Sequence, residues 1–127
     1  MRLLLDSHTL LWFVTAPERL RRSAFDAITD PANDVAYSAV TPWELAISRA
    51  KGRLRYTDDE MKRGIDAQGF AELPITSRYG SFAAALLSLH QDPFDRMLIA
   101  QAMLEGLTLV THDWLIRRYP AVALMEA

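Results

Sequence analysis

The chain has 127 residues, half of them hydrophobic and 24% charged, with a formal net charge of −2. These values predict one globular domain spanning residues 1–127 and exclude an intrinsically disordered chain. Cysteine is absent, which excludes disulfides and thiolate metal sites and agrees with a reducing cytoplasm. Asp6 interrupts the apolar start, so no signal peptide is expected, and no apolar run approaches the ~20 residues of a membrane span. We therefore expect a cytoplasmic protein without membrane contact, and one whose overall charge carries no basic signature of nucleic-acid binding.

Short apolar runs alternate with helical patterns along the chain. In chain order we predict a strand at 2–5, helices at 10–14 and 18–29, a strand at 35–37, helices at 41–52 and 58–68, a strand at 71–75, a helix at 77–89, a helix from 93 that ends before Gly106, a strand at 107–110 and an edge strand at 121–124. The second helix carries the apolar stripe Leu20, Ala24 and Ile28. Alternation of this kind predicts the α/β class, with a central, mostly parallel sheet of four to five strands covered by helices on both faces.

The most informative segment is residues 92–113, DPFDRMLIAQAMLEGLTLVTHD. Asp92 has the chemistry of an N-cap and Pro93 suits the first helical position, where a missing N–H costs nothing. Gly106 stands where a helix ends in a left-handed residue. The unit therefore predicts a helix followed by a short buried strand, with Asp95 in the first helical turn and Asp113 just beyond the strand.

Four acids are expected to meet at one edge of the sheet. Asp6 and Asp113 each follow a strand, and Glu44 and Asp95 lie in the first turns of helices. In parallel α/β sheets, ligand sites form outside the carboxyl ends of the strands, where right-handed crossovers also bring the starts of the following helices. The pattern predicts one acidic cluster.

Each acid also has a purely structural interpretation. Thr41 and Glu44 fit a capping box, Asp95 could complement the helix dipole, Asp6 could cap the helix after the first strand, and Asp113 could be a turn residue. A cap contributes ~1 kcal/mol, whereas two carboxylates ~4 Å apart repel by about 4 kcal/mol at an effective dielectric of 20. If these acids do converge, a divalent cation is their natural partner.

The donor types favour Mg²⁺ or Mn²⁺ over zinc. Carboxylate oxygens are hard ligands that suit these two ions. His8, His90 and His112 lack the spacing of zinc ligands.

Three segments in this order resemble the PIN-domain family: LLLDSHTLLWF, SAVTPWELAI and the 92–113 segment. Within it they are similar to the VapC-type toxin ribonucleases of type II toxin–antitoxin systems. The resemblance implies a three-layer α/β/α PIN-like fold and a catalytic, metal-binding quartet for Mg²⁺ or Mn²⁺. The quartet is Asp6, Glu44, Asp95 and Asp113. Asp92 does not match a ligand position of the family.

Further site residues and partners follow from the same resemblance. Ser7 and Thr111 match small hydroxyl residues that assist at the site. The family also implies a small cognate antitoxin that blocks the acidic pocket, and a homodimer. We expect the antitoxin in an apolar groove near Leu11, Trp12 and Trp43.

The leading hypothesis is a metal-dependent endoribonuclease in which a water attacks the RNA phosphodiester. Arg96 is a candidate phosphate contact. The clusters Arg19–Arg22 and Arg49–Arg55 could supply positive surface for RNA, although helix arginines are usually solvated. Trp12, Trp43 and Trp114 could stack bases, although core packing or burial against a partner is the commoner role of such residues.

Two other functions stay open at this point. One is a non-catalytic PIN-like module that binds RNA or protein. The other is a phosphotransfer enzyme with Asp6 as the nucleophile; His8 stands where such enzymes place a second aspartate, which disfavours it.

Overall fold

The structure, a computed structural model, describes residues 1–87, 91–113, 115–119 and 122–127. Its five strands form one sheet in the order β3–β2–β1–β4–β5, and every neighbouring pair is parallel. The strands are β1 (Arg2–Leu5), β2 (Asp34–Ser38), β3 (Ala71–Leu73), β4 (Thr108–Thr111) and β5 (Ala123–Glu126). The predicted central parallel sheet is confirmed.

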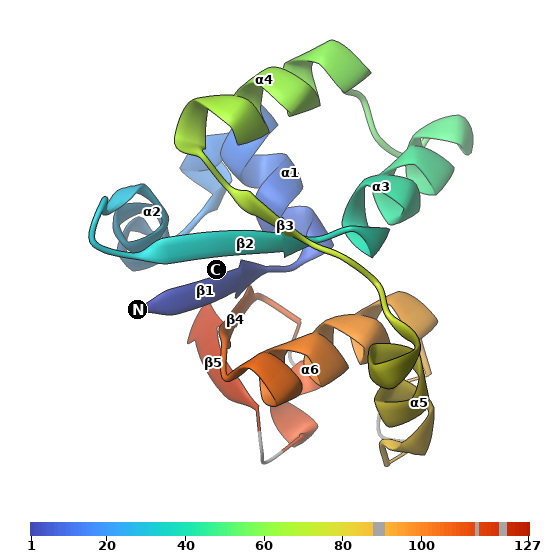
Figure 1. The fold of residues 1–127 in the computed structure, drawn as a ribbon. Helices are drawn as coiled ribbons and strands as arrows, with labels where there is room; N and C mark the ends of the chain where they lie inside the picture. Colours follow the sequence, from blue (N-terminus) through green and yellow to red (C-terminus); the bar gives the residue numbers. More distant parts are fainter. Residues whose placement is uncertain (88–90, 114, 120–121) are drawn as a thin grey trace.

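Helices cover both faces of the sheet, which confirms the three-layer α/β/α fold. They are α1 (Ser7–Thr15), α2 (Arg22–Thr29), α3 (Val40–Ala50), α4 (Asp58–Gln68), α5 (Ser77–Ala85) and α6 (Pro93–Glu105), with 3₁₀ turns η1 (Pro17–Arg19) and η2 (Ile116–Arg118). Figure 1 shows α1, α2 and α4 on one side of the sheet and α5 and α6 on the other. Among the described helices, none combines the length and the apolar character needed to cross a bilayer.

Strand β1 lies at the centre of the sheet and connects two hydrophobic cores. Leu3 and Leu5 pack with α1, α2 and α4, whereas Leu4 packs with α6 and β4. All three leucines are fully buried. Burial on both faces explains why β1 is a continuous apolar run rather than an alternating one.

The segment predicted as one helix over 18–29 is divided into η1 and α2. The backbone of Leu20 and Arg21 is extended, so the helix begins again only at Arg22. Leu20, Ala24 and Ile28 are nevertheless all buried. The apolar stripe was therefore correctly identified, but the spacing did not reveal the break.

Element ends account for the other differences. Asp6 caps α1, so this helix starts at Ser7 rather than at Leu10. Helix α5 ends at Ala85, where Leu86 becomes extended; Leu89, the predicted end, lies outside the described residues.

Two strands also differ from their predicted bounds. Strand β3 stops at Leu73, before Pro74, whose missing N–H cannot continue the ladder. The edge strand occupies Ala123–Glu126; the predicted start, Ala121, is also outside the described residues.

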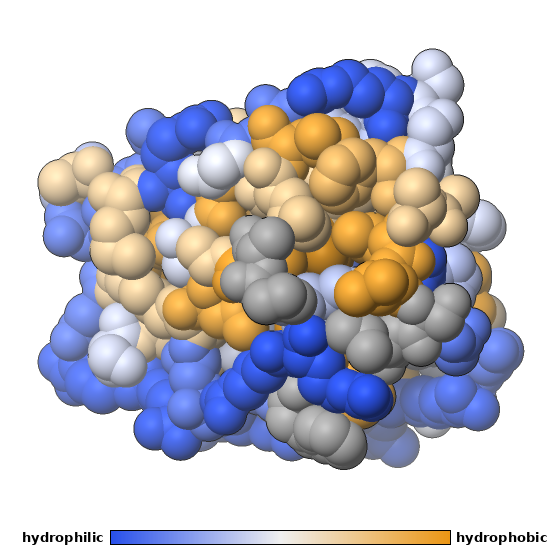
Figure 2. Space-filling view, turned by 90° about the horizontal axis from the view of Figure 1, so that it is seen from below, coloured by the Kyte–Doolittle hydropathy of each residue, from blue (hydrophilic) through white to orange (hydrophobic). Residues whose placement is uncertain are grey.

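Apolar surface is exposed on the side of the molecule where α5 and α6 lie. Figure 2, which views the molecule from below, shows hydrophobic side chains gathered across the middle of this face and hydrophilic ones around them. Leu87, just after α5, is 66% exposed. Contiguous apolar surface of this kind is typical of association sites.

Helix α4 packs closely against α1 through a glycine. A Cβ added at Gly64 would lie 2.8 Å from Cγ2 of Val14, whereas a Cβ at Gly80 of α5 would meet nothing within 4 Å. We expect Gly80→Ala to stabilise the fold by about 0.5–1 kcal/mol, since alanine is the better helix former. Gly64→Ala should destabilise it by about 1 kcal/mol or more through overpacking, as measured by urea unfolding.

The double variant Gly64→Ala/Val14→Ala is the control for this contact. Removing the two valine methyl groups should recover part of the loss caused by Gly64→Ala. If Gly64→Ala proves as stabilising as Gly80→Ala, the close approach of α1 and α4 is wrong.

Candidate metal centre at the carboxyl edge of the sheet

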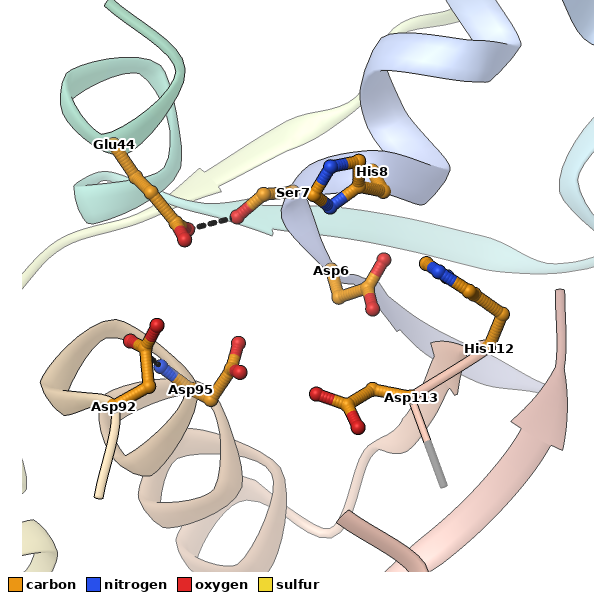
Figure 3. Close-up of a pocket in the computed structure, with 8 residues that line it drawn as sticks. All are labelled: Asp6, Ser7, His8, Glu44, Asp92, Asp95, His112 and Asp113. Carbon is orange, nitrogen blue, oxygen red and sulfur yellow. Dashed lines mark hydrogen bonds between the residues drawn. The ribbon is translucent and has the colours of Figure 1, made fainter. Parts of the chain in front are cut away.

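Five carboxylates from four separate segments line one hollow at the carboxyl edge of the sheet. The hollow, hereafter the acidic hollow, has a volume of about 350 Å³. Its lining residues, all shown in Figure 3, are Asp6, Ser7, His8, Glu44, Asp92, Asp95, His112 and Asp113. The hollow thus brings together all four acids predicted from the sequence, and adds Asp92.

Topology accounts for this convergence. Strands β1 and β4 are parallel neighbours, with Leu5 paired to Val110, so Asp6 and Asp113 leave the sheet at the same edge. Figure 3 shows Asp95, from the start of α6, and Asp113 directing their carboxylates towards one another across the hollow. Glu44 reaches the hollow from α3.

Asp6 is both a helix cap and a wall of the hollow. Its Oδ1 accepts a hydrogen bond from the Thr9 N–H at 2.9 Å, and its Oδ2 accepts one from the Thr111 hydroxyl at 2.5 Å. The side chain is buried. The cap interpretation is therefore correct, and it coexists with a position in the acidic hollow.

Thr111 connects Asp6 to Asp113. Its hydroxyl donates to Asp6 and accepts from the Asp113 N–H at 3.0 Å, while Asp113 Oδ1 accepts from the Leu115 N–H at 2.9 Å. Asp113 is thus a turn residue, as the structural interpretation held. Thr111 therefore orients the Asp6 carboxylate and fixes the backbone of Asp113, and it is itself buried.

Asp92 was set aside as a metal ligand on the sequence, but the structure places it within the cluster. It caps α6 as predicted, because its Oδ1 accepts from the N–H groups of Phe94 and Asp95 at 2.8 and 3.2 Å. Carboxylate oxygens of Glu44, Asp92 and Asp95 also lie within 4.8 Å of one another. The spacing of Asp92 and Asp95, three residues apart at a helix start, is the sequence signal that could have indicated this.

The predicted capping box of Thr41 and Glu44 is wrong. Helix α3 begins at Val40, and its N-cap residue Ala39 makes no side-chain cap. The Thr41 hydroxyl is buried without a hydrogen-bond partner. The Glu44 carboxylate instead accepts a hydrogen bond from the Ser7 hydroxyl (Figure 3). Glu44 is therefore directed into the hollow by Ser7.

The cluster favours protonation of Asp95 and Glu44 when no cation is present. Burial raises the pKa of Asp95 to about 8, and the negative charges of Asp92, Glu44, Asp6 and Asp113 add to the rise. Burial also raises the pKa of Glu44, with smaller contributions from Asp92 and Asp6, while the Ser7 hydrogen bond lowers it. Mutual repulsion and burial therefore both act against the ionised state.

The donor set fits a hard divalent cation. Every carboxylate of the hollow offers oxygen, and three of them already lie within 4.8 Å of one another. Oxygen-only sites without thiolates suit Mg²⁺ and Mn²⁺. A dication would replace the protons and remove the repulsion.

Arg96, predicted as a phosphate contact, is not among the residues that line the acidic hollow. Its guanidinium donates to the carbonyls of Ala83 and Leu86, each at 2.8 Å, and of Leu87 at 3.0 Å. These carbonyls lie at the end of α5 and just beyond it. The structure therefore gives Arg96 a structural role, holding α5 against α6.

The three tryptophans do not share one environment. Trp12 is half-buried against the core and lines a hollow with Leu11. Trp43 is 63% exposed, so core packing is wrong for it, and its ring meets Phe94 edge-on at 5.3 Å. Trp43 does not line the hollow of Leu11 and Trp12, so the predicted groove containing all three is not formed. Trp114 and His90 lie outside the described residues.

Comparison with known proteins identifies the family. The PIN domain family model matches residues 3–122. The chain belongs to the PIN-domain family. It is 33% identical over 121 residues to ribonuclease VapC22 of Mycobacterium tuberculosis (strain ATCC 25618 / H37Rv), covering 91% of this chain and 90% of that protein.

Solved structures share the PIN fold over nearly the whole chain. VapBC2 from Rickettsia felis, bound to a promoter DNA fragment, matches with a TM-score of 0.73 at 15% identity, covering 100% of this chain and 99% of that one. A toxin–antitoxin complex from Klebsiella pneumoniae matches with a TM-score of 0.68 at 22% identity, covering 98% of each chain. At these identities the likeness concerns the fold.

The raised pKa of Asp95 predicts how stability depends on pH. The folded-state value of about 8 lies above the ordinary 3.8, so the folded chain keeps a proton that the unfolded chain releases. Metal-free protein should therefore lose stability as the pH rises from about 4 to about 8, by up to roughly 1 kcal/mol per pH unit from this group. Asp95→Asn should flatten the slope and be the more stable protein at pH 7, as measured by urea unfolding in EDTA.

Asp59→Asn is the matched control, because Asp59 is exposed and forms a surface ion pair with Arg63 away from the acidic hollow. This change should shift stability by less than about 0.5 kcal/mol. Equal pH slopes for wild type and Asp95→Asn would show that Asp95 is not held among the other carboxylates.

Proposed function

We propose that residues 1–127 form a single PIN domain acting as a VapC-type endoribonuclease that depends on Mg²⁺ or Mn²⁺. The observation that carries the proposal is the acidic hollow, where five carboxylates from distant segments face one another. Membership of the PIN-domain family and 33% identity to a VapC ribonuclease support it.

Asp6, Glu44, Asp95 and Asp113 are the proposed metal ligands, and Asp92 is a fifth carboxylate beside them. When bound, the cation lowers the pKa of a water and neutralises charge that develops on the phosphate. The chain's own residues supply orientation: Ser7 directs the Glu44 carboxylate, and Thr111 directs the Asp6 carboxylate and holds the backbone of Asp113. Water oxygen bonds to phosphorus as the bond to O3′ breaks, which leaves 5′-phosphate and 3′-hydroxyl ends.

The energetics of the hollow favour a nuclease over a metal-free binding module. The raised pKa values of Asp95 and Glu44 mean that their ionised forms destabilise the fold unless a cation or protons compensate. A module that binds RNA without metal has no need of such a cluster, and the five negative side chains repel a phosphate backbone. Metal-dependent catalysis explains both features.

A covalent role for Asp6 in phosphotransfer is disfavoured. Enzymes of that kind place a second aspartate two residues after the nucleophile, and this chain has His8 there.

We also propose that the protein pairs with a small antitoxin and forms a homodimer. The R. felis and K. pneumoniae structures with the same fold are toxin–antitoxin complexes. The exposed apolar face around α5 and α6 (Figure 2) is a suitable surface for such association.

Asp6→Asn and Asp95→Asn test the mechanism. Each should reduce Mn²⁺-dependent RNA cleavage by more than about 100-fold, because loss of a metal ligand should exceed the 10–100-fold effect of its supporting groups. Calorimetric titration with Mn²⁺ should show weaker binding to both variants. Asp59→Asn should cleave RNA like wild type.

Undiminished cleavage by both purified variants would contradict the proposed mechanism. Absence of Mn²⁺ binding to the wild-type protein, together with RNA binding, would instead favour the non-catalytic module.

Thr111→Val tests the support that Thr111 gives to the Asp6 carboxylate and to the Asp113 backbone. Valine keeps the shape of threonine but removes both hydrogen bonds, so cleavage should fall about 10- to 100-fold. Thr111→Ser, which keeps the hydroxyl, should retain most activity. Equal rates for the valine and serine variants would show that Thr111 only fills space.

A further inference from the structure

A second hollow of opposite character adjoins the acidic one. It has a volume of about 470 Å³ and is hereafter the basic hollow. It is lined by His8, Leu11, Trp12, Thr15, Ala16, Arg19, Arg53, Leu54, Arg55 and His112. Three arginines and no acid are among these described residues, whereas five acids and no lysine or arginine line the acidic hollow. His8 and His112 belong to both, so the two hollows share a wall.

The arginines of the basic hollow differ from their sequence neighbours in being unpaired. Arg21, Arg22 and Arg49 form ion pairs with Glu126, Asp26 and Asp58. Within the described part of the chain, Arg19, Arg53 and Arg55 have no such carboxylate partner, and all three are exposed. The basic hollow thus combines one arginine of the 19–22 cluster with two arginines of the 49–55 cluster. Unpaired guanidinium groups are ready to contact phosphate oxygens.

Three aromatic rings and the Arg19 guanidinium lie close together where the two hollows meet. The Arg19 guanidinium carbon lies 4.6 Å from the centroid of the Trp12 ring. The His112 ring is tilted against Trp12 at 4.6 Å, and His8 meets His112 edge-on at 5.7 Å. Nucleobases stack on aromatic rings and on guanidinium planes. This series therefore offers a platform for a base directly beside the carboxylates.

We propose that the basic hollow is a substrate subsite that holds a single-stranded RNA nucleotide adjacent to the one being cleaved. Its base stacks on the Arg19–Trp12 pair, and Arg53 and Arg55 contact its flanking phosphates. The inference rests on the proposed ribonuclease function and adds a substrate class to it. Only an unpaired nucleotide can present a free base face, so the subsite selects single-stranded over duplex RNA.

The separation of the acidic and basic hollows explains how a protein with a net negative charge can bind RNA. The acidic hollow needs a cation to accept the scissile phosphate, whereas the neighbouring phosphates lie on arginines that need none. RNA affinity should therefore persist without metal and depend on salt.

The test measures RNA affinity in EDTA, where cleavage cannot proceed. The probe is a fluorescein-labelled single-stranded RNA of twelve nucleotides, followed by anisotropy. Arg53→Gln/Arg55→Gln should weaken binding by about 10-fold or more and reduce the salt slope by roughly 1.4, at about 0.7 per phosphate contact. The charge-matched control Arg22→Gln/Arg63→Gln, in ion pairs elsewhere, should stay within about 2-fold of wild type.

Substitutions of Trp12 test the platform separately. Trp12→Leu should weaken RNA binding about 5- to 100-fold, and Trp12→Phe, which keeps an aromatic ring, by no more than about 3-fold. Because Trp12 also packs on the core, Mn²⁺ titration of each variant serves as the check of folding. The arginine variants lie on the exposed segment after α3 and test the subsite even if Trp12→Leu does not fold.

Kinetics separate this inference from the proposed function. With Mn²⁺, the basic-hollow variants should raise KM and leave kcat within about 3-fold, whereas Asp95→Asn should lower kcat.

If wild type fails to cleave RNA but the arginine variants still lose RNA affinity, the proposed function is wrong and the subsite is supported. Unchanged RNA affinity in the arginine and Trp12→Leu variants would overturn the subsite alone, as would equal affinity for duplex RNA. Unchanged RNA affinity together with lost antitoxin binding would assign the hollow to a protein partner.

Discussion

Repulsion among the carboxylates of the acidic hollow is the constraint to which the rest of the structure responds. Two such groups ~4 Å apart repel by about 4 kcal/mol at an effective dielectric of 20. The fold opposes this by giving the acids local backbone partners: Asp6 accepts from Thr9, Asp92 from Phe94, and Asp113 from Leu115. Each such bond contributes ~1 kcal/mol. The same side chains therefore anchor element ends and line the hollow, and the proposed dication would offset the remaining repulsion.

The buried sheet provides the rigid support that this cluster requires. Leu3, Leu4 and Leu5 are packed on both faces of β1, so Asp6 emerges from a strand that cannot shift without opening both cores. Strand β4 runs parallel beside it and delivers Thr111 and Asp113 to the same edge. A hydroxyl from one strand thus orients a carboxylate from the next, a contact that spans 105 positions in the sequence.

Opposite charges are separated by place rather than mixed. The acidic hollow and the basic hollow share the histidines at positions 8 and 112, yet among the described residues no arginine lines the first and no acid lines the second. Ion pairs between those arginines and carboxylates would neutralise both the proposed metal site and the proposed phosphate contacts. The near-zero net charge of the chain therefore conceals two strong local fields, which is why composition was a poor guide to its substrate.

Local patterns in the sequence were sufficient to predict the sheet, both caps of α6 and the apolar stripe of α2, because these depend on near neighbours. They also predicted that the acids converge at the carboxyl edge, because the handedness of parallel crossovers fixes that edge. They did not reveal several contacts of Glu44, Asp92 and Arg96, because those contacts join different elements. Glu44 meets Ser7 of α1, Asp92 meets Glu44 across two helices, and Arg96 meets the carbonyls at the end of α5. The sequence thus determined which chemistry the chain carries, while tertiary packing decided which side chains face one another, because a side chain's partner depends on distances that spacing along the chain does not encode.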